Sequence, residues 1–448
     1  METTELLYHL FLQSKGVTTD SRQCAEGMMF FALKGERFDG NAYALQALEK
    51  GCLCAVVDDI SFKNASDKRL VYVENVLLAL QQLARHHRRT LGLPVIGITG
   101  TNGKTTTKEL IAAVLCRKFR THYTQGNLNN QIGVPLTLLQ LTSQHQLAVV
   151  EMGASHPGDI KELVDIAEPD YGIITNVGRA HLQGFGSFEG VIRTKGELYD
   201  FLRSREGGLI FLHNDNPYLK AIAQGLNTIR YGTATGNEPL AVSGELISCD
   251  PFLRFRWQAN GIPTHTIDTH LVGGYNIDNA LCAITVGRYF GVSDEDIDAA
   301  IEGYLPSNSR SQLIMTSQNT LIVDAYNANP TSMRASLLNF HQMESSNKVV
   351  IIGDMKELGN ASAEEHVAIV KLIDECTFEK VWLVGQNFHE ALAAVHGKED
   401  GENDSSRYRT FASAEEVLDY LKANALSGCS VLVKGSNSMR LSSLIPAL

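Results

Sequence analysis

The chain has 448 residues, of which 44% are hydrophobic and 20% are charged, and its formal net charge is −11. A chain of this length is too long for one hydrophobic core, so about three domains of ordinary size are expected. The composition excludes a mostly disordered chain and is typical of a globular enzyme. The negative charge disfavours nonspecific binding to nucleic acid or to an anionic membrane, which leaves small molecules as the expected partners.

Signals for export, membrane insertion and disulfide bonding are weak in this sequence. The first residues, Met1 to Tyr8, contain acidic and no basic side chains, so we expect no export signal. No stretch is long and apolar enough for a membrane span. The eight cysteines are scattered, which predicts buried thiols in a reducing cytosol. Cys52 and Cys54 lack a second pair at ligand spacing, so core packing is expected there rather than metal binding.

Residues 1–90 are predicted to form a first, small α/β unit. Its predicted elements are strands at 28–33 and 55–57 and helices at 42–50 and 77–89. The tripeptide Asp20, Ser21 and Arg22 can hydrogen-bond a polar ligand such as a nucleotide base or phosphate. A helix cap with a solvated arginine is the alternative, and the residues alone favour it.

The second unit, residues 91–307, contains the most specific motif of the chain. The stretch 95–106 (VIGITGTNGKTT) gives an apolar strand, a glycine turn and the start of a helix, which is the order in phosphate-cradling loops. Its glycines let backbone N–H groups and the helix N-terminus point at an anion. Lys104 would contact the β- and γ-phosphates, and Thr105 would bind Mg²⁺. An ordinary glycine turn is a weak alternative, although Ile98 stands where the strict pattern has its first glycine.

Strands and helices alternate through this unit, which predicts a mostly parallel sheet covered by helices. The predicted elements are strands at 95–99, 146–151, 171–175 and 208–212 and helices at 105–118, 158–167 and 188–204. Ligands of such sheets gather at the carboxyl ends of the strands. Glu151 lies at such an end and can bind Mg²⁺ directly or through water. His181 and the 126–130 loop lie near the same edge, although a histidine taken alone is more often a loop or core residue.

The remainder of the second unit changes character. Apolar runs at 240–247, 252–258 and 264–269 predict an antiparallel patch, and a helix is expected at 276–287. Asn276 and Asn279 are three residues apart on one face of that helix and can present amide groups to a base. Capping of the helix by Asn276 is an alternative that is compatible with base binding.

The third unit, residues 308–448, is predicted to be a smaller doubly wound domain. Its predicted elements are strands at 320–323, 348–352, 380–384 and 430–433 and helices at 332–342, 363–375 and 412–425. Polar loops at 324–330, 353–359 and 434–439 begin where these strands end. Because the carboxyl ends of parallel strands share one edge, these loops can face the phosphate loop across a cleft.

Seven stretches, in order, resemble the Mur ligase family across all three units. They are Thr99–Thr106, Gly126–Pro135, Glu151–Ser155, Asn176–His181, Tyr275–Ala280, Asp324–Pro330 and Gly353–Gly359. The first stretch resembles the family's own variant of the phosphate loop, which explains why Ile98 stands where the strict pattern has a glycine. The resemblance implies a three-domain α/β fold with a small N-terminal domain, a central P-loop ATPase domain built on a parallel sheet, and a C-terminal Rossmann-like domain. It also implies an ATP-dependent ligase that joins a carboxylate to an amine through an acyl phosphate.

Within the family, the third unit resembles the members that add D-Ala-D-Ala to a UDP-MurNAc-tripeptide in peptidoglycan synthesis. The alternatives are a sibling amide ligase that adds the third residue and a folylpolyglutamate synthase. A P-loop GTPase would need an Asn-Lys-x-Asp stretch, which the sequence lacks, and a noncatalytic scaffold is disfavoured because the catalytic positions are filled. Tyr275, Ser309 and Asn437 depart from the usual family residues.

The resemblance assigns roles to individual residues and implies a monomeric enzyme of the bacterial cytoplasm. Lys104, Lys195, His181 and Arg310 would be catalytic. ATP would be bound by Gly100, Thr101, Asn102, Gly103, Lys104, Thr105, Thr106, Asn276, Asn279, Arg310, Asp324 and Tyr326. Thr105 and Glu151 would hold one Mg²⁺. His181 and Lys195, carbamylated by CO₂, would hold a second Mg²⁺. Without the resemblance, Lys195 would be expected to be a solvated helix lysine. The UDP-sugar substrate would be held by Asp20, Ser21, Arg22, Asn127, Asn129 and Asn130.

Overall fold

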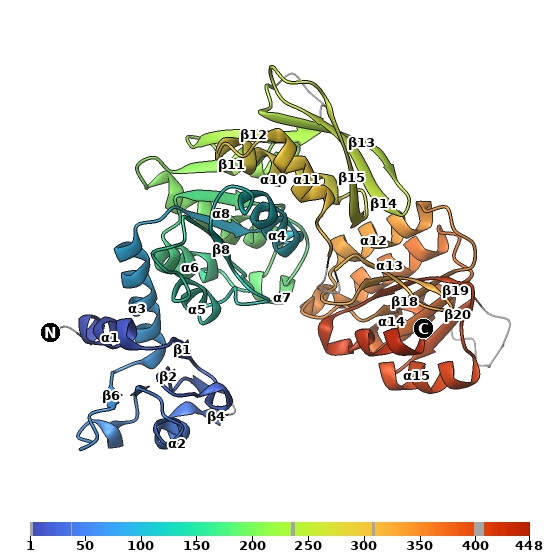
Figure 1. Ribbon diagram of the computed structural model, residues 1–448. Helices are drawn as coiled ribbons and strands as arrows, with labels where there is room; N and C mark the ends of the chain where they lie inside the picture. The colour runs from blue at the N-terminus through green and yellow to red at the C-terminus, as the bar shows by residue number, and fades with distance from the viewer. Residues whose placement is uncertain (1–2, 37, 234–237, 307–309, 398–406) are drawn as a thin grey trace.

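The computed structural model describes residues 3–36, 38–233, 238–306, 310–397 and 407–448. Figure 1 shows three units arranged in an arch, with the N-terminal unit at the lower left, the central unit above it and the C-terminal unit at the right. Each unit has a main sheet of its own. This arrangement confirms the predicted three-part α/β fold with parallel sheets.

The N-terminal unit is built on a four-stranded parallel sheet in the order β1-β2-β5-β6. Its helices and strands are α1 (Thr3–Gln13), β1 (Val17–Thr18), β2 (Met29–Phe31), β3 (Lys34–Gly35), β4 (Phe38–Asp39), α2 (Ala44–Glu49), β5 (Cys54–Val57), β6 (Leu70–Tyr72) and α3 (Val76–Leu91), with 3-10 turns at Ser21–Gln23, Gly40–Tyr43 and Ile60–Phe62. Sequence patterns missed α1, and they also missed the short edge strands β1 and β6, because two or three residues carry too little periodicity.

Helix α3 joins the N-terminal unit to the central one. It begins where the Asn75 side chain accepts a hydrogen bond from the N–H of Leu78, and it ends at Gly92, whose φ of 65° suits glycine after a helix. The Arg88 side chain donates to the carbonyl of Ala167 at 3.1 Å and pairs with Asp170 at 2.9 Å. One apolar core therefore runs from the N-terminal sheet through α3 to the central sheet.

The central unit has a nine-stranded sheet in the order β15-β14-β13-β12-β11-β10-β7-β9-β8. Its elements are β7 (Val95–Thr99), α4 (Lys104–Leu115), β8 (Thr121–Tyr123), α5 (Gly133–Leu138), β9 (Leu147–Glu151), α6 (Asp159–Ala167), β10 (Tyr171–Ile174), α7 (Leu182–Phe185), α8 (Phe188–Arg203), β11 (Leu209–His213), α9 (Pro217–Ile222), β12 (Asn227–Thr233), β13 (Val242–Cys249), β14 (Phe252–Gln258), β15 (His265–Val272), α10 (Asn276–Tyr289) and α11 (Asp294–Glu302). The pairs from β8 to β13 are parallel and the pairs among β13, β14 and β15 are antiparallel. The predicted antiparallel patch thus extends the main sheet.

Alternate residues of the central strands belong to two cores, one on each face of the sheet. In β7, Val95 packs in one apolar cluster and Ile96 and Ile98 in the other. A strand that is buried on both faces reads as a continuous apolar run, which is why β7, β9, β10 and β11 were predicted to within one residue at each end. The less buried strands β8 and β12 were not predicted. Helix α4 ends three residues before the predicted boundary, at Leu115. No glycine or proline marks that end, so the sequence pattern alone did not locate it.

The C-terminal unit has a six-stranded sheet in the order β16-β17-β21-β18-β19-β20, with β16 antiparallel to β17 and the other pairs parallel. Its elements are β16 (Gln312–Met315), β17 (Thr320–Asp324), α12 (Pro330–Gln342), β18 (Lys348–Gly353), α13 (Ser362–Asp374), β19 (Lys380–Val384), α14 (Gln386–His396), β20 (Tyr408–Phe411), α15 (Ala414–Ala423) and β21 (Ser430–Lys434), with 3-10 turns at Gly359–Ala361, Asn437–Met439 and Leu441–Ala447. Residues of α12, α13 and α14 pack in one core and residues of α15 in another. The predicted doubly wound sheet is confirmed.

Candidate active site

A cleft of about 590 Å³ lies between the central and C-terminal units. Its lining includes fourteen of the predicted site residues: Thr101, Asn102, Gly103, Lys104, Thr106, Asn129, Asn130, Glu151, His181, Asn276, Asn279, Arg310, Asp324 and Tyr326. Most of them come from loops at the carboxyl ends of strands and from the first turns of α4 and α10, and Arg310 comes from the segment before β16. The two sheets therefore present their ligand-binding edges to one another.

The phosphate loop connects β7 to α4 and depends on two glycines. Gly100 has a φ of 144° and Gly103 a φ of 78°, which are conformations that other residues rarely adopt. A Cβ atom at Gly103 would lie 2.6 Å from Oδ1 of Asn279, and one at Gly100 would lie 2.0 Å from Oγ1 of Thr175. Both glycines are therefore required by backbone conformation and by close packing.

Lys104 follows directly at the start of α4. Its Nζ donates to the carbonyl oxygens of Gly100 at 2.7 Å and Thr101 at 3.1 Å. Burial lowers the pKa of Lys104 to about 8, against the opposing effect of Glu151, and the nearby Arg310 lowers it further. The ammonium is thus held over the loop where phosphate oxygens would be cradled.

Glu151, at the end of β9, is the centre of a buried polar cluster. Its Oε2 accepts a hydrogen bond from the Thr105 hydroxyl at 2.9 Å, and its Oε1 accepts one from the Asn129 side chain at 2.8 Å. The Nζ of Lys108 lies 3.7 Å from Oε2. Asn129, which was predicted to hold the UDP-sugar substrate, thus contacts the predicted metal ligand in this structure.

Two of the predicted metal ligands, the Thr105 hydroxyl and the Glu151 carboxylate, suit Mg²⁺ in type, whereas the imidazole of His181 is a less usual ligand for this ion. Among the described residues, no three His, Cys, Asp or Glu side chains cluster to hold a metal. Mg²⁺ is usually held by one or two carboxylates together with waters and substrate phosphates, so it does not need such a cluster. The contact between the Thr105 hydroxyl and the Glu151 carboxylate beside the phosphate loop fits such a site.

Lys195 lies on α8, where it is 2% exposed rather than solvated. Its Nζ is 3.5 Å from the carbonyl oxygen of Ala154, which lines the cleft. Burial, and then the nearby charge of Lys104, hold the pKa of Lys195 well below its ordinary value. A lowered pKa favours the neutral amine, which is the form that can react with CO₂.

The predicted adenine residues Asn276 and Asn279 are tied into a network of their own. The side chain of Asn276 donates to the carbonyl of Val272 at 2.9 Å, and that of Asn279 donates to Oδ1 of Asn276 at 2.8 Å. Oδ1 of Asn279 accepts from the Thr107 hydroxyl at 2.9 Å. Asn276 does not cap α10, because the cap position is Tyr275 and no side chain caps it. The capping alternative was therefore wrong, since the Asn276 amide bonds to the preceding strand instead.

The C-terminal unit contributes a cation and a buried ion pair to the cleft. The Arg310 guanidinium lies 4.1 Å from the ring centre of Tyr326, and its Nε has no hydrogen-bond partner within the described chain. Asp324, at the end of β17, accepts from Nζ of Lys434 at 2.5 Å and from the Ser336 hydroxyl at 3.1 Å. Lys434 is 1% exposed, so the carboxylate is held in one orientation.

His181, on the central unit, contacts the C-terminal unit. Its Nδ1 lies against Oε2 of Glu357, and this contact lowers the pKa of Glu357. Both residues line the cleft.

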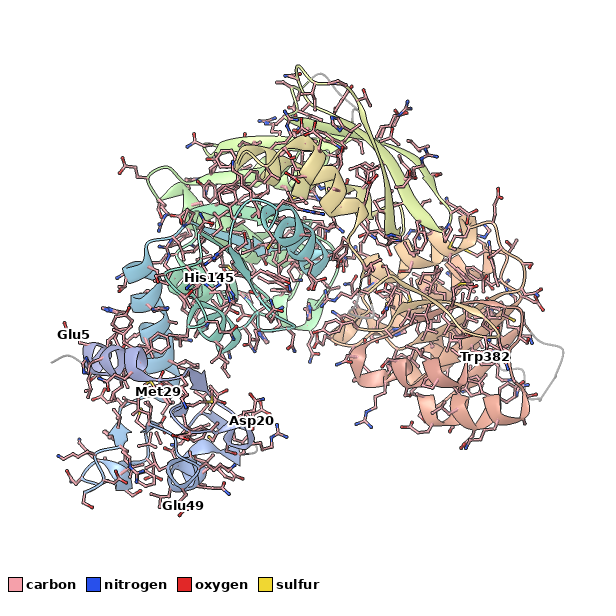
Figure 2. All side chains as sticks on the ribbon, viewed as in Figure 1. Glu5, Asp20, Met29, Glu49, His145 and Trp382 are labelled. Atoms are coloured by element: carbon pink, nitrogen blue, oxygen red, sulfur yellow. The ribbon has the colours of Figure 1, made fainter. Side chains whose placement is uncertain are left out.

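The predicted substrate residues of the first unit lie outside the cleft. Asp20 accepts from the N–H of Arg22 and caps the 3-10 turn, and Arg22 has an 87% exposed side chain that pairs with Asp20 at 2.8 Å. This pairing lowers the pKa of Asp20 to about 2. The structure thus has the geometry of the cap with a solvated arginine. Figure 2 shows Asp20 on the N-terminal unit, far from Trp382 of the C-terminal unit. Ser21 and Asn127 are also absent from the lining of the cleft, although Asn130 reaches it.

The three departures from the family pattern differ in position. Tyr275 lines the cleft, and its hydroxyl is 2.7 Å from that of Ser311. Asn437 is exposed in the 3-10 turn after β21. Ser309 lies outside the described residues.

Sequence patterns did not single out three charged residues of the site: Lys108, Glu357 and Lys434. Glu357 and Lys434 belong to strand-end stretches that were predicted to face the cleft, so their place at the ends of strands could have identified them as site residues. Lys108 is one of two lysines four residues apart on α4, and only tertiary packing shows that it is buried.

Known proteins are similar to this chain in all three of its units. Family models match residues 13–88 (Mur ligase family, catalytic domain), 98–287 (Mur ligase middle domain) and 309–437 (Mur ligase, glutamate ligase domain). The chain is 36% identical to the UDP-N-acetylmuramoyl-tripeptide–D-alanyl-D-alanine ligase of Bacillus subtilis, over 97% of this chain and 93% of that one. It is 32% identical to the ligase of the same name from Escherichia coli, over 96% and 93%.

Solved structures are similar over almost the whole chain. MurF from Acinetobacter baumannii has a TM-score of 0.85 and 31% identity and covers 99% of this chain and 97% of its own. The MurF ligase of Thermotoga maritima in complex with ADP has a TM-score of 0.83 and 26% identity, with coverage of 98% and 97%. The resemblance inferred from motifs is confirmed, and this chain belongs to the Mur ligase family.

Proposed function

We propose that this chain is an ATP-dependent ligase that joins the amino group of D-Ala-D-Ala to the terminal carboxylate of a UDP-MurNAc-tripeptide, in the synthesis of a peptidoglycan precursor. The observation that carries the proposal is the near full-length similarity to ligases named for this reaction. The cleft supports it, because the phosphate loop at the strand-end edge of the central sheet meets residues from the strand-end edge of the C-terminal sheet there.

The chemistry explains why such a site needs cations. A carboxylate is a poor electrophile, so ATP first converts it to an acyl phosphate, which the amine attacks as phosphate leaves. Transfer of the γ-phosphoryl group to an anion brings negative charges together, and preorganised positive groups offset them. Lys104 and Arg310 supply fixed positive charge, and the N-terminus of α4 adds its dipole.

Two Mg²⁺ ions, when bound, would neutralise further phosphate charge. Thr105 and Glu151 would hold the first ion, and His181 and a carbamylated Lys195 the second. The buried amine with its lowered pKa supports the carbamate, because an ammonium beside a metal ion would be repelled and a carbamate would not.

The nucleotide would lie between the phosphate loop and the C-terminal unit. Asn276 and Asn279 would contact the adenine, and Tyr326 and Asp324 the adenine and ribose. Lys434 would keep the Asp324 carboxylate directed into the cleft. Since both asparagine side chains already have partners, contacts to adenine would use their remaining hydrogen-bonding capacity.

The UDP-sugar would be held by Asp20, Ser21, Arg22 and the loop with Asn127, Asn129 and Asn130. Three domains would divide these tasks, with residues 1–90 for the nucleotide-linked peptide, 91–307 for ATP and 308–448 to close the cleft. Within the described ranges, no helix is both long and apolar enough to span a bilayer. We further propose a monomeric enzyme of the bacterial cytoplasm.

Product identification tests the function. Purified protein, ATP, Mg²⁺ and bicarbonate are incubated with UDP-MurNAc-tripeptides that end in lysine or in diaminopimelate, each paired with D-Ala-D-Ala, single amino acids or glutamate. Mass spectrometry is expected to show the nucleotide-linked pentapeptide and ADP only with D-Ala-D-Ala. In parallel reactions that supply a UDP-MurNAc-dipeptide or a folate, addition of a single amino acid or of glutamate would identify a sibling ligase instead.

A further inference from the structure

Two non-glycine residues with a left-handed backbone meet across the cleft. His181 has a φ of 50° and Glu357 a φ of 65°, and their side chains are in contact although they belong to different units. Such conformations are uncommon for residues other than glycine, although histidine adopts them more often than most, and they cluster at functional sites. The contact between His181 and Glu357 therefore suits a role beyond packing.

The loop that carries Glu357 is anchored at its start. The buried Asp354 carboxylate accepts hydrogen bonds from the N–H of Phe388 at 3.0 Å and from the N–H and side chain of Asn387 at 3.2 and 2.9 Å, at the N-terminus of α14. The N–H of the next residue, Met355, donates to Nε2 of His366 at 3.0 Å.

The loop is equally fixed at its centre. The N–H of Lys356 donates to the Ser436 hydroxyl at 3.1 Å, and the carbonyl of Glu357 accepts from the N–H of Gln183 at 3.3 Å. Leu358 is buried with 2% exposure. The main chain on both sides of the Glu357 side chain is thus held by contacts with other elements.

This rigid loop presents one carboxylate to the cleft. Of residues 353–359, all of which are described, Glu357 alone lines the cleft, and its side chain is 61% exposed. The nucleotide and the peptide carboxylate are anions, and Lys104 and Arg310 suit them. A carboxylate in the same cleft repels both anions and suits a cation instead.

The acceptor of the ligation is the reactant that brings a cation to the reacting carbonyl. We infer that Glu357 binds the ammonium group of the incoming amino acid or dipeptide. This contact would hold the acceptor nitrogen inside the cleft. In the present structure the ring nitrogen of His181 occupies that position. The inference rests on the proposed function, and it makes Glu357 a specificity residue for acceptors with a free amine.

Steady-state kinetics with each of the three substrates varied in turn test the inference. Glu357→Gln keeps the shape and removes the charge, so it is expected to raise the KM for D-Ala-D-Ala by about 10- to 100-fold, as for the loss of a charged hydrogen bond. The KM values for ATP and for the UDP-tripeptide are expected to change by no more than about twofold, within the spread of surface substitutions. In single turnovers without acceptor, ADP formation is expected to match that of the unchanged protein.

The rival explanation is an ion pair that only holds two units together, and a second pair provides the control. Arg179 and Glu365 join the same two units at 3.0 Å and do not line the cleft. Arg179→Gln loosens this contact and is expected to leave the KM for the acceptor unchanged. Glu357→Asp keeps the charge with a shorter reach and is expected to raise the KM for the acceptor less than Glu357→Gln does. If the glutamine variant folds poorly, the aspartate variant still tests the role of the carboxylate.

The outcomes separate the two proposals. If the unchanged protein forms no pentapeptide product, the proposed function fails. If it does and Glu357→Gln leaves the acceptor KM unchanged, the inference about Glu357 fails alone. A rise in the KM for the UDP-tripeptide instead would also overturn the inference, because the carboxylate would then bind the ammonium group of that peptide. An equal effect of Arg179→Gln on the KM for the acceptor would overturn it too, because the carboxylate would then only hold the two units together.

Discussion

The ammonium of Lys108 lies 3.7 Å from the carboxylate of Glu151, and each side chain is 1% exposed. The Nζ atom has no hydrogen-bond partner within the described chain, and the ring of Tyr123 lies 5.8 Å away. Burial lowers the pKa of Lys108, against the opposing effect of Glu151. A lysine is rarely buried in this way unless it is paired, so the pair balances charge beneath the phosphate loop.

Lys108→Met is therefore expected to destabilise the central unit. The variant keeps the length of the side chain but removes the ammonium that pairs with the buried Glu151 carboxylate and lies 3.8 Å from Glu109, which costs about 3–5 kcal/mol. Thermal unfolding without nucleotide measures the effect, and adding Glu151→Gln is expected to restore part of the loss. Lys161→Met removes an exposed pair with Asp165 and is the control, with an expected loss below about 1 kcal/mol. Equal midpoints for both single variants would contradict this account.

His87 makes stability depend on pH at the junction of the first two units. Its Nε2 lies 2.9 Å from the carbonyl oxygen of Leu141, and burial lowers its pKa. The unfolded chain therefore binds a proton near pH 6.5 that the folded chain does not bind until a lower pH. Stability is fully present above about pH 6.5 and falls as pH decreases through the window below it, by at most about 1.4 kcal/mol per pH unit.

Thermal midpoints between pH 7.5 and 5 test this expectation. His87→Phe is expected to make the curve flatter at acid pH, whereas substitution of the exposed His9 by glutamine is expected to leave its slope unchanged. A wild-type curve that rises on acidification below pH 6.5 would show that His87 does not dominate there.

Lys195→Ala is expected to lose most ligase activity, because a carbamate can no longer form. Short carboxylic acids added to the assay are expected to restore part of it by supplying the missing oxygens. Binding of Mg²⁺ in the presence of an ATP analogue, followed by calorimetry, gives a second measure. Lys161→Ala, on the exposed face of α6, is the control. Full activity of Lys195→Ala without added acid would exclude the carbamate role.

Asn329 joins the phosphate loop to the C-terminal unit. It caps α12 by accepting from the N–H of Ser332, and its side-chain amide donates to Oδ1 of Asn102 at 2.7 Å. Asn329→Ser keeps a capping side chain but is too short for Asn102, so stability is expected to change by less than about 0.5 kcal/mol. The affinity for ATP is expected to fall by about 3- to 10-fold, through loss of one neutral hydrogen bond. Fluorescence titration with an ATP analogue measures this, and an unchanged affinity would show that the contact does not support the loop.

Substrate binding is expected to draw the units together. Asp20, Ser21 and Arg22 lie outside the cleft, although the proposed reaction needs the nucleotide-linked peptide to meet ATP. Closure would also exclude water from the acyl phosphate. Small-angle scattering is expected to show a smaller radius of gyration with an ATP analogue and UDP-tripeptide together than with either alone. No compaction would count against closure.

The sequence by itself determined the features that depend on local order. Apolar runs buried on both faces marked the central strands, and glycines of the phosphate loop stand where the backbone needs positive φ or close approach. Long motifs in a fixed order identified the family. Short edge strands escaped because two or three residues carry too little periodicity, and the end of α4 at Leu115 escaped because no glycine or proline marks it.

Only the tertiary structure decided which charges are buried and which side chains meet. Lys195 and Lys108 look like ordinary helix lysines until α8 and α4 are packed on the sheet, and Asn276 bonds to Val272 instead of capping its helix. The contact of His181 with Glu357 joins residues from two units. Burial and long-range contact depend on how the elements pack, and a chain pattern that repeats every two to four residues does not contain that information.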